Sequence, residues 1–192
     1  MLKTRFSAVT WMGLSLLGLA AIAPSANANV IIQIQEVGGN VVATGNGTIN
    51  LTGLSFFTSS TFGGSVNPSN ANVIVGPSSL TDLYSGPTSS LVMGAGASAL
   101  ASFSSGNHFG IEGNFLVDVP HGYTSGTSLS GSSTFSGKTF ASLGLNPGTY
   151  TYSWSADSVT VQVGPSTPEP ATAAMVVLGL GVVFWKRRAT NV

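Results

Sequence analysis

Residues 149–163 read TYTYSWSADSVTVQV, and this stretch decides the fold class. Every second position is aromatic in residues 149–155 and is valine in residues 158–163, so each segment is predicted to be a β-strand with one buried face. Ala156-Asp157 makes a short bend between them, and Asn146-Pro147-Gly148 is a strong turn signal before them. Aromatic side chains opposite valines form favourable cross-strand pairs, so we expect this hairpin to be central to the core. The inward positions would be Tyr150, Tyr152, Trp154, Val159, Val161 and Val163.

A second hairpin is predicted nearer the N-terminus. Residues 30–37 alternate apolar and polar side chains, and Gly38-Gly39 supplies the positive φ angles of a tight turn. The return strand, residues 40–52, shows the same period of two, and its Gly45 and Gly47 predict a bulge or a close backbone approach. The apolar face of the first strand would be Val30, Ile32 and Ile34.

The middle of the chain contains short apolar segments separated by Gly and Pro turns. After residues 54–57 we expect an irregular polar stretch, then a turn at residues 67–70, and later a single helical turn at residues 142–144. The remaining candidate strands are residues 72–75, 80–84, 91–93, 99–103, 108–111, 115–119 and 129–135. About eight to eleven strands at roughly ten-residue spacing predict an all-β fold, an antiparallel β-sandwich in a jelly-roll-like arrangement.

The charge balance of this part of the chain excludes one class of partner. Residues 29–165 contain five acids but a single base, Lys138, which leaves a net charge of minus four. A domain with one lysine and no arginine cannot make the many phosphate contacts that drive nucleic-acid binding. There is also no cysteine, so no disulfide can brace the domain. The five acids are Glu36, Asp82, Glu112, Asp118 and Asp157.

The C-terminal residues 166–192 have the pattern of a membrane segment. Pro168-Glu169-Pro170 precede the uncharged, apolar residues 171–185, and Lys186-Arg187-Arg188 follow. A helix of that length reaches roughly 22 Å, short of a hydrocarbon core of about 30 Å, but the basic side chains can snorkel and Trp185 suits the interface. The positive-inside rule then places the basic block in the cytoplasm and everything before Pro168 outside the cytoplasmic membrane.

These three parts, in this order, resemble the PEP-CTERM protein-sorting signal. The resemblance covers residues 167–188 and departs mildly in residues 189–192, because many members end soon after an all-arginine run. It implies recognition at Pro168, Glu169 and Pro170 by an exosortase, a membrane-embedded cysteine transpeptidase-like enzyme of Gram-negative bacteria that export polysaccharide. The stretch from residue 41 to residue 163 also resembles exported domains that precede such tails and have no assigned activity. The alternative is an ordinary C-terminal membrane anchor, with Lys186, Arg187 and Arg188 as its stop.

The N-terminal residues 1–28 read as a secretory signal peptide. Lys3 and Arg5 precede an apolar run over residues 6–23, and Ala26-Asn27-Ala28 is an A-x-A site for signal peptidase. Cleavage after Ala28 would leave residues 29–165 as the exported domain. The alternative is an uncleaved N-terminal membrane helix.

Two histidine pairings are the strongest candidates for chemistry. His108 with Glu112 reads H-x-x-x-E, and Asp118 with His121 reads D-x-x-H, so either pair could bind a metal or act as an acid and a base. Neither is a recognised zinc arrangement, and residues four apart on a strand lie about 13 Å apart. We interpret both as loop histidines and predict no catalytic, metal or cofactor site.

The expected function is an exported cell-surface or extracellular-matrix protein with a structural or adhesive role linked to exopolysaccharide. A carbohydrate-binding module is the alternative, and Tyr123, in the loop of residues 120–123, is its tentative glycan contact because Tyr150, Tyr152 and Trp154 are expected to face the core. A secreted hydrolase is the third hypothesis. The chain has no G-x-S-x-G motif, and the five acids are too scattered to select a catalytic pair.

Overall fold

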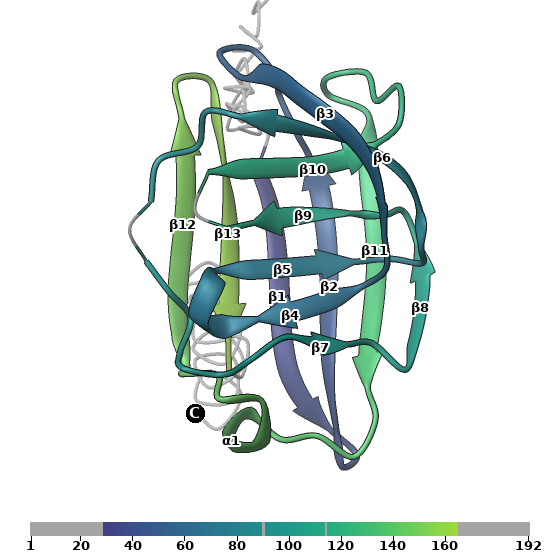
Figure 1. Ribbon diagram of the computed structural model, residues 1–192, viewed down its shortest axis with the longest axis vertical. Coiled ribbons are helices and arrows are strands. Elements are labelled where there is room, and N and C mark those ends of the chain that lie inside the picture. Colours follow the sequence, from purple (N-terminus) through teal and green to yellow (C-terminus); the bar gives the residue numbers. More distant parts are fainter. Residues whose placement is uncertain (1–28, 90, 114, 165–192) are drawn as a thin grey trace, which may run out of the picture.

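The computed structural model describes residues 29–89, 91–113 and 115–164, which form thirteen strands in two sheets. Figure 1 shows the sheets as two layers, with the strands of the front sheet running across those of the rear sheet. The rear sheet, sheet A, contains in order β12 (Gly148–Trp154), β13 (Asp157–Val163), β1 (Asn29–Val37), β2 (Asn40–Thr48), β11 (Ser128–Phe135) and β8 (Phe103–Gly106). The front sheet, sheet B, contains in order β3 (Ser55–Phe62), β6 (Ser79–Ser85), β10 (Leu116–Pro120), β9 (Phe109–Glu112), β5 (Asn72–Val75), β4 (Ser65–Asn67) and β7 (Ala99–Leu100). The predicted all-β class is confirmed.

The hairpin of β1 and β2 forms as its sequence predicts. Gly38 and Gly39 have φ angles of +57° and +79°, the left-handed conformation that a two-residue hairpin needs. The register of β2 is regular against both neighbouring strands, so its glycines do not make a bulge. They allow close approach instead, since a Cβ atom at Gly45 would lie 2.7 Å from the ring of Phe109 in sheet B. The strand ends at Thr48, four residues before its predicted end.

The hairpin of β12 and β13 lies at one side of sheet A, not at its centre. β12 is the outermost strand, while β13 lies between β12 and β1 and buries its valines. The pairing of β13 with β1 is parallel, from Asn29 opposite Ser158 to Ile34 opposite Val163. The expected purely antiparallel sandwich is therefore wrong at this one pair, because the first and last strands enter the same sheet in the same direction.

Several segment predictions were wrong at the edges of sheet B. The polar stretch after residue 57 continues as β3 to Phe62, residues 91–93 form no strand, and residues 99–103 contribute to two strands in different sheets. β3 is an edge strand with every residue at least partly exposed. Apolar and polar residues alternate along a strand when one of its faces is buried. An edge strand that is exposed on both faces therefore lacks this alternation.

The helical turn predicted at residues 142–144 is α1 (Phe140–Leu143). Thr139 caps it, accepting from the backbone N–H of Ser142 while the Ser142 hydroxyl accepts from Thr139, and Gly144 ends it at φ +65°. The turn predicted at residues 67–70 contains the 3-10 helix η1 (Pro68–Asn70). Both short elements therefore form where their turn residues predict them.

The core lies between the sheets, and this leaves sheet B with a second, outer face. Phe109 and Ile111 of β9 and Val117 and Val119 of β10 are fully buried in the core. Because side chains alternate along a strand, the residues between and beside them point to the outer face. These are His108, Glu112 and Asp118, the candidate residues for chemistry.

No helix in the part of the chain that the structure describes is long and apolar enough to cross a membrane. The predicted signal peptide, residues 1–28, and the predicted transmembrane helix, residues 171–185, lie outside the described residues.

Candidate functional site

The structure pairs the two histidines differently from the sequence motifs. His108 contacts Asp118 of β10, and His121 contacts Asp82 of β6. The strand register explains this, because Asp82 lies opposite Val119 on the core side while Asp118 points outward. His108 lies in the loop between β8 and β9, as interpreted, but its side chain is almost completely buried.

The His108 ring is held between two acceptors. Its Nδ1 lies 2.9 Å from the carbonyl oxygen of Pro77, and its Nε2 lies 3.0 Å from Oδ2 of Asp118. A carbonyl and a carboxylate only accept hydrogen bonds, so both contacts form only if both ring nitrogens are protonated. Burial alone lowers the pKa of His108, but the hydrogen bond and charge of Asp118, with the bond to Pro77, raise it above its ordinary value. When the ring is protonated, the pair is a buried ion pair.

Glu112 lies beside this pair with one oxygen unused. Among the described residues, Oε2 of Glu112 and Oδ1 of Asp118 are buried without a hydrogen-bond partner. Burial, followed by the negative charge of Asp118, raises the pKa of the Glu112 carboxyl, and His108 offsets part of that rise. The described residues contain no group of three His, Cys, Asp or Glu side chains arranged to hold a metal. The cluster thus presents two buried carboxyl oxygens without hydrogen-bond partners among the described residues.

A pocket of about 280 Å³ opens over this outer face of sheet B. Its lining combines amides and hydroxyls with the Glu112 carboxyl and a phenyl ring. The lining residues are Phe62, Gly63, Ser65, Asn67, Asn70, Asn72, Ile74, Ser98, Leu100 and Glu112. Sequence reasoning missed all of them except Glu112, because they come from β3, β4, β5, β7, β9 and the loops between them and share no local pattern.

The second histidine belongs to a network at another place. Asp82 accepts from the Ser59 hydroxyl at 2.7 Å, from Nδ1 of His121 at 2.8 Å and from the backbone N–H of Gly122 at 2.9 Å. Burial alone would raise the pKa of Asp82, but these hydrogen bonds together lower it. Ser59 bonds to the carboxylate and not to the imidazole, so the three side chains do not form a Ser-His-Asp catalytic arrangement. They fasten the turn after β10 to β6.

Tyr123, the predicted glycan contact, is partly buried. Its hydroxyl donates to the carbonyl oxygen of Thr127 at 2.6 Å and accepts from the backbone N–H of Ile49 at 3.0 Å. The ring packs against the core. The side chain thus joins two loops, and its contact with a glycan stays a prediction.

The aromatic residues of β12 face inward, as expected. Tyr152 is fully buried, and Tyr150 and Trp154 pack against the core. The indole N–H of Trp154 donates to the carbonyl oxygen of Asn50 at 2.8 Å. These rings build or pack against the core.

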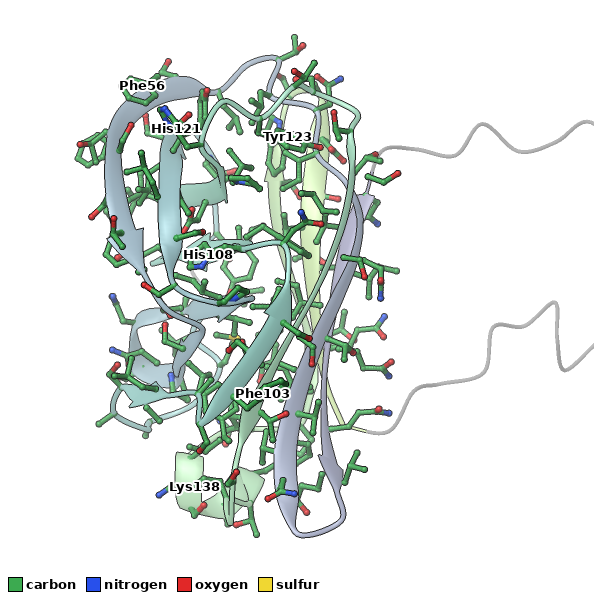
Figure 2. The ribbon with its side chains drawn as sticks, turned by 90° about the vertical axis from the view of Figure 1, so that its right-hand side faces the viewer. Phe56, Phe103, His108, His121, Tyr123 and Lys138 are labelled. Atoms are coloured by element: carbon green, nitrogen blue, oxygen red, sulfur yellow. The ribbon has the colours of Figure 1, made fainter. Side chains whose placement is uncertain are left out.

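Other aromatic side chains, which sequence reasoning did not single out, are at the surface. Phe56, Phe57, Phe103 and Phe115 are each more than half exposed. Figure 2 shows Phe56 at the surface, in contrast to His108 in the interior. The signal in the sequence was the pair Phe56-Phe57 within a serine and threonine stretch, which is unusual for a buried strand.

The remaining predicted site residues lie outside the described residues. They are the cleavage residues Ala26 and Ala28, the motif Pro168, Glu169 and Pro170, and the basic block Lys186, Arg187 and Arg188.

The described residues define an all-β domain of two packed sheets, with a polar pocket on the outer face of one sheet and few charges. No family model, no curated protein and no solved structure matches the chain.

Proposed function

We propose that this chain is an exported, non-enzymatic protein of the cell surface or extracellular matrix, sorted through its C-terminal residues 166–192. The observation that carries the proposal is the order of Pro168-Glu169-Pro170, an apolar segment and a basic block at one end, with a signal-peptide pattern at the other. The implied partners are signal peptidase, an exosortase and the cytoplasmic membrane, followed by exopolysaccharide once the protein is outside.

The fold supports the predicted limits of the exported domain. β1 begins at Asn29, directly after the predicted cleavage site, and its residues 29–34 pair with β13, which ends at Val163. The first and last strands of the sandwich thus lie next to each other in one sheet, within the predicted range of residues 29–165. A unit closed in this way can be exported and then cut from its tail without losing a strand.

The surface chemistry supports a structural or adhesive role over an enzymatic one. The described residues contain one lysine and no arginine, and their two ion pairs both join a histidine to an aspartate. Neither histidine lies beside a nucleophile in these contacts.

The finer jelly-roll arrangement stays a prediction. The chain crosses between the sheets after β2, β7, β8 and β10, as Greek-key connections do.

The sorting proposal is tested by replacing Pro168, Glu169 and Pro170 with alanine in the native host. We expect the wild-type protein to be found outside the cell without its tail, as read by intact mass after fractionation. The alanine variant, and the wild-type protein in a strain lacking the exosortase, should remain full-length in the membrane. Ser166→Ala with Thr167→Ala is the matched control and should be processed normally.

Normal processing of the triple-alanine variant would refute sorting through this motif. Retention of residues 171–188 in the membrane of both strains would identify the tail as an ordinary anchor.

A further inference from the structure

The outer face of sheet B gathers polar side chains from the three strands β4, β5 and β9 into one pocket. Ser65 lies opposite both Leu100 and Ile74, and Asn67 lies opposite Asn72. Val73 of β5 lies opposite Ile111 of β9 in an antiparallel register. The next position in that register places Asn72 opposite Glu112. Strand pairing alone therefore brings two amides and a carboxyl into a row.

The two amides are oriented by their own hydrogen bonds. Oδ1 of Asn72 accepts from the Ser65 hydroxyl at 3.1 Å, and Oδ1 of Asn67 accepts from the Ser69 hydroxyl at 3.0 Å. With each oxygen engaged, each amide nitrogen is left as the donor toward the pocket. The pocket thus offers donors that are already fixed in orientation.

The carboxyl in the same row provides an acceptor. Oε2 of Glu112 is buried and has no hydrogen-bond partner in the described part of the chain. The Glu112 residue lines the pocket, and a carboxyl without protein partners gains binding free energy from a ligand hydroxyl that donates to it. Behind it, Asp118 is held by its bond to His108 and adds negative potential.

The lining excludes several classes of ligand. It contains no lysine, arginine or histidine, and Glu112 is its one ionisable residue, so a phosphate, sulfate or carboxylate would be repelled. A bound metal is disfavoured, because the described residues hold no three suitable ligands in one group. Only Phe62, Ile74 and Leu100 provide apolar contact, too little for a purely hydrophobic molecule. What fits is a neutral molecule rich in hydroxyl groups with one apolar face.

We propose that this pocket binds a neutral sugar unit of a polysaccharide. Neighbouring hydroxyls of the sugar accept from the amides of Asn67 and Asn72 and donate to the Glu112 carboxyl, while the ring of Phe62 contacts the apolar face of the sugar. A volume of about 280 Å³ is at the small end of ligand pockets, which limits the occupant to one or two sugar rings. The inference rests on the proposed surface location for access to the polymer, but the pocket itself is tested without it.

The test uses the full chain, purified in a detergent without a sugar headgroup so that the detergent does not compete. Saturation-transfer NMR is recorded with glucose, galactose, mannose and N-acetylglucosamine as neutral probes, and with glucuronate as the anionic one. We expect at least one neutral sugar to bind with a Kd on the order of 1 mM, as few polar contacts allow, and glucuronate to bind more weakly.

Two substitutions of similar volume test the contacts. Asn72→Leu removes the donor and Glu112→Met removes the acceptor, and each should weaken binding roughly tenfold or more. Asn46→Leu is the matched control: Asn46 accepts from the Ser130 hydroxyl at 3.0 Å, as Asn72 does from Ser65, but it lies on sheet A. The control should bind like the wild-type protein, and circular dichroism establishes that all variants are folded.

Three outcomes overturn the proposal. The first is that no neutral probe binds at 50-fold the expected Kd, roughly 50 mM. The second is unchanged binding in folded Asn72→Leu. The third is loss of binding in Tyr123→Ala while both pocket variants bind normally, which would move the site to the Tyr123 loop. None of these affects the sorting proposal, which depends on proteolysis and fractionation in cells.

Discussion

The buried pair of His108 and Asp118 predicts very different effects for two substitutions at position 118. Asp118→Ala leaves the protonated imidazole of His108 buried without its counter-charge. Asp118→Asn keeps the shape of the side chain, and a neutral His108 can then donate from Nδ1 to Pro77 and accept through Nε2 from the new amide. Removing one partner of a buried ion pair costs roughly 3–5 kcal/mol, so we expect that loss in Asp118→Ala and about 1 kcal/mol in Asp118→Asn.

The same pair sets a pH dependence with a definite sign. The pKa of His108 in the folded protein lies above the ordinary 6.5, so folding favours the protonated ring. The stability that protonation of His108 contributes is complete below about pH 6.5. It is lost as the pH rises through the pKa of His108 in the folded protein, and it amounts to about 1.4 kcal/mol for each unit between the folded and unfolded pKa values. The raised pKa of Glu112 likewise makes the protein less stable as the pH rises, but this loss begins at the ordinary pKa of the carboxyl, 4.5. Asp118→Asn should remove the slope above pH 6.5 and weaken the lower one, which burial of Glu112 still maintains after the charge of Asp118 is gone.

Denaturant unfolding between pH 4 and pH 9, followed by Trp154 fluorescence, measures both effects. Trp11 and Trp185 are replaced by phenylalanine in every variant so that Trp154 is the single reporter. Equal losses in Asp118→Ala and Asp118→Asn, or a wild-type stability that rises from pH 6.5 to pH 9, would refute the reasoning.

Two further predictions concern the core. Tyr152→Phe removes a hydroxyl that is buried without a partner among the described residues, so stability should stay the same or rise by about 1 kcal/mol. Burial, then Tyr150, raises the pKa of Tyr152 to about 12, so this residue alone should cost the wild-type protein up to about 2.7 kcal/mol as the pH rises from 10 to 12. Thermal unfolding should show a smaller loss in the variant, which keeps Tyr123 and Tyr150 with their raised pKa values. Gly45→Ala forces a methyl group to within 2.7 Å of the Phe109 ring and should cost roughly 1–3 kcal/mol, measured by urea unfolding. Gly63→Ala, whose Cβ would meet its nearest atom at 3.8 Å, is the control, and equal losses in both would contradict this account of close packing.

Much of sheet A could be predicted from the sequence because its strands have one buried and one exposed face. The bounds of β1 and β11 differ from the predicted ones by a single residue, and Val159 and Val161 of β13 are fully buried as expected. β3 could not be recognised in the same way, since an edge strand in contact with solvent on both faces shows no periodicity. The split of residues 99–103 between two sheets depends on a chain crossing that leaves no local pattern.

The site was less predictable than the fold. Sequence spacing suggested His108 with Glu112 and Asp118 with His121, and both pairings were wrong as contacts between the side chains. The register of β6, β9 and β10 determines which aspartate each histidine contacts. This register cannot be predicted from the spacing of residues within one segment. The pocket lining likewise draws on strands far apart along the chain.

By itself, the sequence determined the all-β class, the β1–β2 hairpin, the burial of the β12 and β13 side chains and the near absence of charge, because each depends on local periodicity, turn residues or composition. Only the tertiary structure decided the parallel pairing of β1 with β13, the buried His108–Asp118 pair and the pocket at Glu112. Long-range strand pairing brings these groups together, and its register is fixed by the fit of two whole faces of side chains and not by any one stretch of residues.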